Sequence, residues 1–184
     1  MSSGHTNISG PFAEALDLMR LFGGKGSVVQ IFEADEPVTS YESENPVDPE
    51  IYWKKPLVII CDRKTSGGAE VFCAAIQDYQ RGIVIGGTGT HGRGIVQSAF
   101  DVKESTSLSI PSYGSVKATV TAIFRVPGNS IQHAGVNSDI DFPSLSEVLN
   151  PGEESLENAM KFDPIPPAKY TPFTTDYIQL LNAM

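Results

Sequence analysis

Apolar residues recur with the helical period in two stretches of the chain. The first stretch lies between Pro11 and the glycine pair at residues 23–24, and its spacing of i, i+3, i+4 and i+7 predicts an amphipathic helix over residues 11–22. The second follows the small residues 65–68 and predicts another helix. The apolar positions are Phe12, Ala15, Leu16 and Met19 in the first stretch and Phe72, Ala75, Ile76 and Tyr79 in the second.

Short apolar runs on either side of the second helix predict strands. Residues 57–61 and 82–86 are continuously apolar, which is typical of strands buried on both faces of a parallel sheet. A strand, a helix and a strand thus follow one another, and the predicted fold class is α/β. Residues 27–33, 94–102 and 115–126 are further expected strands, and we expect the last two to extend the same sheet.

The remaining segments are expected at the surface. Between residues 33 and 50, seven acidic residues and three prolines occur without Lys or Arg, which predicts a solvated loop or hairpin. Residues 127–129 predict a turn. After residue 143 the chain is rich in proline, so we expect a tail that wraps the surface, with a short helix over 175–183. The predicted organisation is a core over residues 1–149 and a tail over 150–184.

Composition and charge narrow the classes of function. With 184 residues, 40% of them hydrophobic, the chain suits one globular domain. No apolar run approaches the ~20 residues of a membrane span, and no export signal follows Met1. The net charge of −9 and the lack of a basic patch disfavour nucleic acid as a partner.

The cysteines and histidines do not form a pattern of metal or cofactor ligands. Cys61 and Cys73 lack a metal-ligand spacing and are predicted to be buried thiols. The three histidines, His5, His91 and His133, have no such spacing either, so no metal or other cofactor is predicted.

A glycine-rich segment at residues 87–94 resembles two phosphate-binding motifs. Residues 87–92 match GxGxxG, but both motifs require a following helix, and residues 94–100 predict a strand. Arg93 also stands where the P-loop has Lys. We therefore expect a tight loop between strands and no nucleotide site.

The turn over residues 65–70 joins a buried strand to the start of a helix. Backbone N–H groups at such a turn lie beside the positive end of the helix dipole and can stabilise an oxyanion, as in many acyl-transfer sites. The alternative is a glycine-rich helix start without chemistry.

The residues around this turn closely resemble the C-terminal processing peptidases, also called tail-specific proteases. The similarity extends over nearly the whole chain, although it corresponds to the C-terminal half of such a protein, without the upstream PDZ domain. It is carried by residues 56–63, 69–79, Arg81, Gly86, 92–97, 114–116, 124–126, Gly128, 135–136, 139–140 and Pro143, and by tail positions between 152 and 170. Ser138 replaces the Pro of the family's Gly-Val-x-Pro-Asp-Ile signature.

The resemblance implies a ClpP/crotonase-like fold and a Ser-Lys dyad that cleaves polypeptides near unstructured C-termini. Anchoring the family's Ser-Ala-Ser-Ala-Ser-Glu on Glu70 places Gly67 at the nucleophile position, and anchoring Gly-Lys-Gly-Thr-Val-Gln on residues 92–97 places Arg93 at the base position. Glycine carries no nucleophile, and a guanidinium does not deprotonate at physiological pH. Asp78 matches a retained acid of the family, and we expect it to pair with Arg81.

Three functions follow as hypotheses. The first is a catalytically inactive peptidase-like domain that binds extended polypeptide by strand addition. The second is an active serine endopeptidase that uses Ser66 with His91 as base, or a site completed by a missing segment, although Ser66 before a helix also suits a cap. The third is a partial structural domain of a larger assembly.

Site and partner expectations follow from the first two hypotheses. Gly68 and Gly92 are the expected loop residues of an oxyanion site. The expected partner is polypeptide, and a second copy of the chain is a further candidate. Family members are usually exported, whereas this chain shows no signal peptide, so its compartment stays open.

Overall fold

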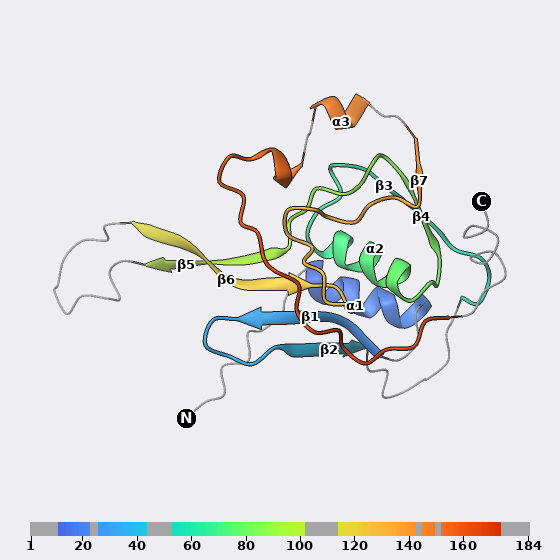
Figure 1. Ribbon diagram of the computed structural model, residues 1–184, viewed down its shortest axis with the longest axis horizontal. Helices are drawn as coiled ribbons and strands as arrows, with labels where there is room; N and C mark the ends of the chain where they lie inside the picture. The colour runs from blue at the N-terminus through green and yellow to red at the C-terminus, as the bar shows by residue number, and fades with distance from the viewer. Residues whose placement is uncertain are drawn as a thin grey trace.

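The computed structural model describes residues 11–22, 26–43, 53–101, 114–142, 145–149 and 152–173. Within these ranges the chain is a mixed α/β structure with two separate β-sheets and the helices α1 and α2 between them (Figure 1). The helix bounds are α1 (Pro11–Phe22), α2 (Gly68–Asp78), α3 (Leu145–Leu149) and the short 3-10 helix η2 (Glu153–Ser155). The helix predicted over residues 11–22 and the helix that follows residues 65–68 are both confirmed. The short helix predicted over 175–183 lies outside the described residues.

The first sheet is antiparallel and has the strand order β2-β1-β6-β5. Its strands are β1 (Gly26–Glu33), β2 (Thr39–Ser43), β5 (Ile95–Asp101) and β6 (Ser115–Phe124). β1 and β2 form a hairpin, which confirms the hairpin predicted for the acidic segment as far as residue 43. β5 and β6 form a ribbon that extends beyond the rest of the sheet (Figure 1).

The second sheet is parallel and has the strand order β3-β4-β7. Its strands are β3 (Val58–Cys61), β4 (Ile83–Gly86) and β7 (Ile140–Asp141). β3 and β4 pair from Val58 opposite Ile83 to Cys61 opposite Gly86, and α2 connects them along the chain. The predicted strand, helix and strand unit is therefore confirmed.

The prediction that residues 94–102 and 115–126 extend this parallel sheet is wrong. The described parallel sheet consists of β3, β4 and β7 alone. β6 instead pairs with β1, opposite residues 30–33, and carries β5 with it into the antiparallel sheet.

The prediction that residues 57–61 are buried on both faces is also wrong. Cys61 is buried, but Val58 is 53% and Ile60 79% exposed. Alternate residues of a strand point to opposite faces, and among the described residues α2 covers one face of this sheet alone (Figure 1).

The core lies where α1 and α2 pack against each other and against both sheets. Fully buried side chains from each of these elements meet there, among them Met19, Val29, Ile76 and Val84. Both cysteines are free and buried, as predicted. Burial raises the pKa of Cys73 to about 12, so its thiol stays protonated at neutral pH.

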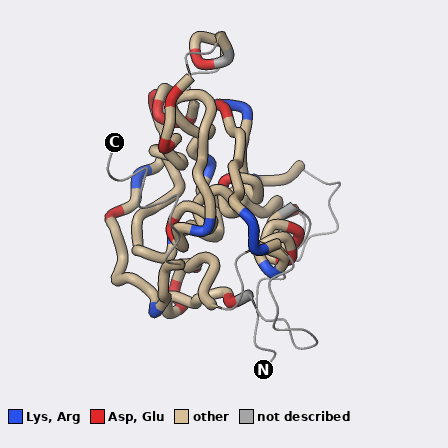
Figure 2. The backbone as a smooth tube through the Cα atoms, turned by 90° about the vertical axis from the view of Figure 1, so that its right-hand side faces the viewer, with Lys and Arg blue, Asp and Glu red and all other residues tan. Residues whose placement is uncertain are grey.

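The C-terminal segment lies along the body of the molecule, as predicted. The N–H of Ile165 donates to Gly128, and that of Ala168 donates to Val126. α3 projects from one end of the molecule, where Glu147 accepts the N–H of Thr88, and it exposes Leu145 and Val148 (Figures 1 and 2). None of the helices in the described ranges has the length and apolar character needed to cross a bilayer.

Tyr79 joins α2 to the first sheet and to the C-terminal segment. Its buried hydroxyl donates to the carbonyl of Ser27 at 2.8 Å, and its ring packs edge-on against Tyr170. The hydroxyl approaches Gly26 so closely that a Cβ there would lie 2.4 Å from the oxygen. Burial raises the pKa of Tyr79 to about 12, which keeps the donor proton in place.

We expect Tyr79→Phe to lower the free energy of unfolding by about 1–2 kcal/mol, because it leaves the buried carbonyl of Ser27 without its donor. Urea denaturation followed by circular dichroism measures the change. Tyr170→Phe is the matched control, since no hydrogen bond of its hydroxyl exists within the described ranges, and it should change stability by less than about 0.5 kcal/mol. Equal effects of the two variants would contradict this role of Tyr79.

Candidate functional site

The turn between β3 and α2 holds Gly67 in a backbone conformation that favours glycine. Gly67 has φ 64° and ψ −125° and forms the N-cap of α2. A Cβ built at Gly67 meets nothing within 4 Å. A side chain at this position would therefore extend into open space, as the nucleophile does on a strained turn from a strand to a helix.

Glu70 holds this turn through an interaction that we call the Glu70 clamp. The side chain is 0% exposed. One carboxylate oxygen, Oε2, accepts the N–H groups of Gly67 and Arg93, each at 2.9 Å. The other, Oε1, accepts the N–H of Gly92 at 2.6 Å and the hydroxyl of Thr90 at 2.5 Å. Four donors thus compensate the desolvation of a buried carboxylate.

The clamp brings together the two positions that the sequence singled out. Gly67 lies at the start of α2 and Arg93 in the loop before β5, yet their backbone nitrogens share one oxygen of Glu70. The side chain of Arg93 is exposed and has no ion-pair partner among the described residues. The glycine-rich segment is a loop between β4 and β5, as predicted.

The two loop glycines differ in what they offer a ligand. The N–H of Gly92 is already donated to Glu70, so it is not available as an oxyanion donor. Gly92 instead allows a close approach, since a Cβ would lie 2.6 Å from the carbonyl of His133. Gly68 is buried at the first position of α2, and its N–H has no acceptor within the described ranges.

Ser66 and His91 are not joined in this structure. Ser66 is exposed, and its hydroxyl makes no hydrogen bond to any described residue. The imidazole Nε2 of His91 lies 3.3 Å from the carboxylate of Glu153. The prediction that Ser66 caps the helix is wrong, because Gly67 is the N-cap and its N–H is bound by Glu70, three residues further on.

Residues 152–154 fasten the loops on both sides of the clamp. Glu153 accepts a hydrogen bond from Gln132 at 2.9 Å, and the N–H of Glu153 donates to the carbonyl of His91. Arg63, in the turn after β3, donates to Glu154 at 2.8 Å and to the carbonyl of Thr90 at 3.0 Å. The C-terminal segment therefore stabilises the position of both loops.

Asp78 lies at the other end of α2 and pairs with Arg125. The Nε of Arg125 lies 3.0 and 3.1 Å from the two carboxylate oxygens, and its Nη2 also contacts Asp78. Burial raises the pKa of Asp78, and the ion pair opposes that shift. The predicted pairing with Arg81 is wrong, since Arg81 donates to main-chain carbonyls that include those of Phe22 and Lys55. Arg125 is 47 residues from Asp78 in the sequence, so the spacing of residues within one helix could not indicate this ion pair.

No cluster of three or more His, Cys, Asp or Glu residues that could hold a metal ion exists in the part of the chain that the structure describes. His91 and His133 have different surroundings, and His5 lies outside the described residues.

Sequence reasoning missed the function of three side chains at this site. Glu70 served as an anchor for the family resemblance, but its burial was not foreseen, although a Glu at the third position of a helix can accept the N-cap N–H. No local pattern indicates that Gln132 and Glu153 contact the loop before β5.

Comparisons with known proteins agree with the resemblance. The model of Peptidase family S41 matches residues 6–142. The tail-specific protease of Haemophilus influenzae is 35% identical over 164 residues, which cover 89% of this chain and 23% of that protein. The chloroplastic C-terminal processing peptidase of Tetradesmus obliquus is 27% identical over 162 residues, which cover 87% of this chain and 32% of that protein.

The solved structures show a similar fold. A photosystem II D1 C-terminal processing protease superposes with a TM-score of 0.59 at 24% identity, over 71% of this chain and 31% of that one. A lipoprotein of Streptococcus agalactiae superposes with a TM-score of 0.54 at 11% identity, over 80% of this chain and 51% of that one. The chain spans less than a third of the length of the curated relatives named above.

We expect Glu70→Gln to lower the free energy of unfolding by about 2–4 kcal/mol, because the amide nitrogen would face backbone N–H groups that need an acceptor. Urea denaturation measures the loss, and hydrogen exchange should be faster at the amides of Gly67, Gly92 and Arg93. Glu157→Gln, on an exposed residue, is the control and should leave both readouts unchanged. Unaltered exchange at the three amides in Glu70→Gln would rule out the clamp.

Proposed function

The chain belongs to peptidase family S41, and we propose that it is a C-terminal processing peptidase-like domain that binds extended polypeptide without hydrolysing it. The observation that carries the proposal is the Glu70 clamp, which joins the two dyad positions while Gly67 offers no nucleophile. The parallel β3-β4-β7 sheet with α2 in its crossover supports the ClpP/crotonase-like core that this proposal includes.

The chemistry of residues 67 and 93 supports the proposal that this chain does not hydrolyse polypeptide. A Ser-Lys dyad needs a hydroxyl that attacks the carbonyl and a neutral amine that takes its proton. Gly67 has no side chain, and the guanidinium of Arg93 keeps its proton at physiological pH. The contacts of the site do not favour Ser66 with His91, because His91 faces Glu153 and no hydrogen bond joins the two residues.

The position of β5 supports polypeptide binding. β5 begins two residues after Arg93 and is the last described strand on its side of the antiparallel sheet. An edge strand presents backbone donors and acceptors to which an extended segment can pair. Val96 and Phe100 are 36% and 53% exposed along this strand and offer apolar contacts. A polypeptide paired with β5 would run towards the Glu70 clamp.

The double substitution Gly67→Ser with Arg93→Lys tests the missing chemistry. We expect a fluorophosphonate probe to label the double variant at position 67, because a Cβ there extends into open space, and to leave the natural chain unlabelled. The natural chain should also leave an unstructured protein intact, as followed by mass spectrometry. The left-handed conformation of residue 67 should cost the variant about 1–2 kcal/mol of stability.

Adding Ser66→Ala to both proteins provides the control and should change neither result. Labelling of Ser66 in the natural chain, or cleavage by it, would show that the natural chain is an enzyme. Failure of a folded double variant to react would mean that the arrangement of the site, and not the two substitutions, prevents the chemistry.

Strand addition at β5 is tested by alternate backbone N-methylation of a binding peptide. In a paired strand every second N–H donates to the neighbouring strand and the others point away. We expect a peptide methylated on one alternate set to bind at least ten-fold more weakly than the parent peptide, and the peptide methylated on the other set to bind within about two-fold of it. Fluorescence anisotropy measures both affinities. Equal binding by the two methylated peptides, or no binding by the parent, would contradict strand addition.

A further inference from the structure

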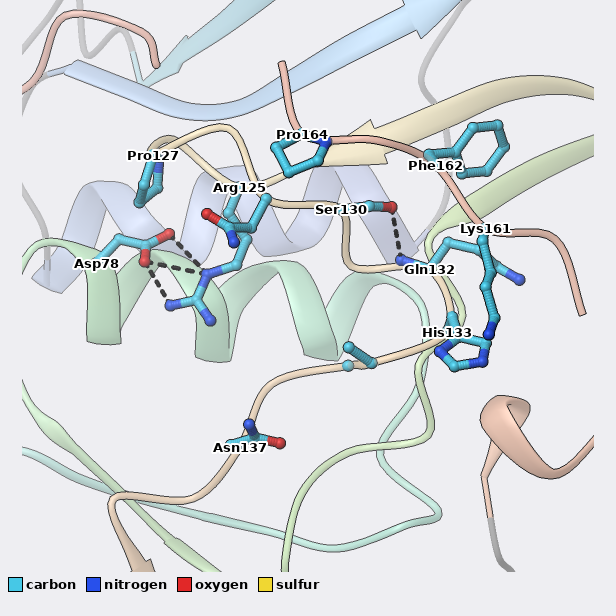
Figure 3. A pocket seen from close by; sticks show the side chains of 13 residues that line it. Asp78, Arg125, Pro127, Ser130, Gln132, His133, Asn137, Lys161, Phe162 and Pro164 are labelled. Carbon is cyan, nitrogen blue, oxygen red and sulfur yellow. Dashed lines mark hydrogen bonds and ion pairs between the residues drawn. The ribbon is translucent and has the colours of Figure 1, made fainter. Parts of the chain in front are cut away.

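A pocket opens beside the Asp78–Arg125 pair, apart from the dyad positions. It has a volume of about 540 Å³. Its walls are the end of α2, the loop over residues 125–137 and the C-terminal segment around residues 161–164 (Figure 3). This volume lies within the range of cavities that hold small molecules.

The side chains that face the pocket provide more hydrogen-bond donors than acceptors. The two oxygens of Asp78 are taken by Arg125. Three donor groups have no acceptor among the residues that the structure describes: the Nη1 of Arg125, the ammonium of Lys161 and the imidazole of His133. Figure 3 shows Lys161 and His133 at one end of the pocket and the Asp78–Arg125 pair at the other.

The charge of the pocket favours a monoanion. Arg125 and Asp78 compensate each other, so Lys161 leaves one formal positive charge without any contribution from His133. A carboxylate supplies the matching single negative charge and accepts hydrogen bonds through two oxygens. Pro164 adds an apolar wall between the two ends, whereas Phe162 lies at the Lys161 end, where its ring packs against Phe124.

We propose that this pocket binds a small carboxylate, with the carboxylate at Lys161 and His133, the apolar part along Pro164, and a second acceptor at the Nη1 of Arg125. The carboxylate can belong to a free acid or to the C-terminal residue of a polypeptide. The proposal does not depend on strand addition at β5, because no residue of β5 lines the pocket.

Nuclear magnetic resonance titration of the full chain tests the proposal with four probes. They are N-acetyl-leucine, its amide, a hexapeptide that ends in leucine with a free carboxylate, and inorganic phosphate. We expect N-acetyl-leucine to shift the amide signals of residues 132–137 and to bind at least five-fold more tightly than its amide. Tighter binding of the hexapeptide than of N-acetyl-leucine identifies the carboxylate as a polypeptide end, and the reverse order identifies a free acid.

Lys161→Gln should weaken binding of N-acetyl-leucine at least five-fold and leave binding of its amide unchanged. Lys169→Gln, on an exposed residue of the same segment that does not line the pocket, is the matched control. The proposal is wrong if acid and amide bind equally, if phosphate binds more tightly than the acid, if no signal shifts, or if the two variants behave alike. Binding to β5 is unaffected in each of these cases, so the two proposals fail separately.

Discussion

The buried carboxylate of Glu70 is the interaction on which the site depends. A carboxylate with no exposed surface is tolerated because four donors surround it, and three of them are backbone N–H groups. Those N–H groups come from two loops that are distant along the chain. Because a buried carboxylate without donors would be costly, Glu70 holds the β3–α2 turn against the loop before β5. Loss of any donor would leave the buried charge less well compensated.

Because the clamp acts on the main chain, it does not require particular side chains at the two positions it joins. Arg93 contributes its N–H to Glu70 while its guanidinium stays exposed, so the side chain can change without disturbing the contact. At Gly67, with φ 64°, glycine avoids the strain that a serine would carry. Glycine at residue 67 thus leaves the turn without this strain, and the Glu70 clamp holds with glycine and arginine at the two positions. The contacts that hold the two loops together are therefore independent of the side chains at residues 67 and 93.

The parts of this structure that sequence reasoning predicted are those set by local pattern. The periods of residues 11–22 and 72–79 identify their helices, and the apolar run before the small-residue turn identifies β3. The partner sheet of β5 and β6 was not predictable in this way, because it depends on the pairing of β6 with β1, which is about 90 residues away in the sequence. For the same reason Asp78 was assigned to nearby Arg81, whereas Arg125 reaches it from the loop after β6. The expectation that residues 67 and 93 lie close together rested on the family resemblance alone, because no local sequence pattern connects them.

The C-terminal segment links the two regions to which functions are proposed. The carboxylate of Glu153 accepts a hydrogen bond from the side-chain nitrogen of Gln132, whose side-chain oxygen in turn accepts the N–H of Gly94, the residue after Arg93. His133, the next residue, donates its N–H to the carbonyl of Gly92 and also lines the pocket beside Asp78 and Arg125. Gln132 and His133 therefore contact the loop held by Glu70 from one side and the pocket from the other. Because both contacts on the loop use main-chain groups, a displacement of residues 132–133 by a bound ligand would be transmitted to the loop before β5 whatever side chain residue 93 carries.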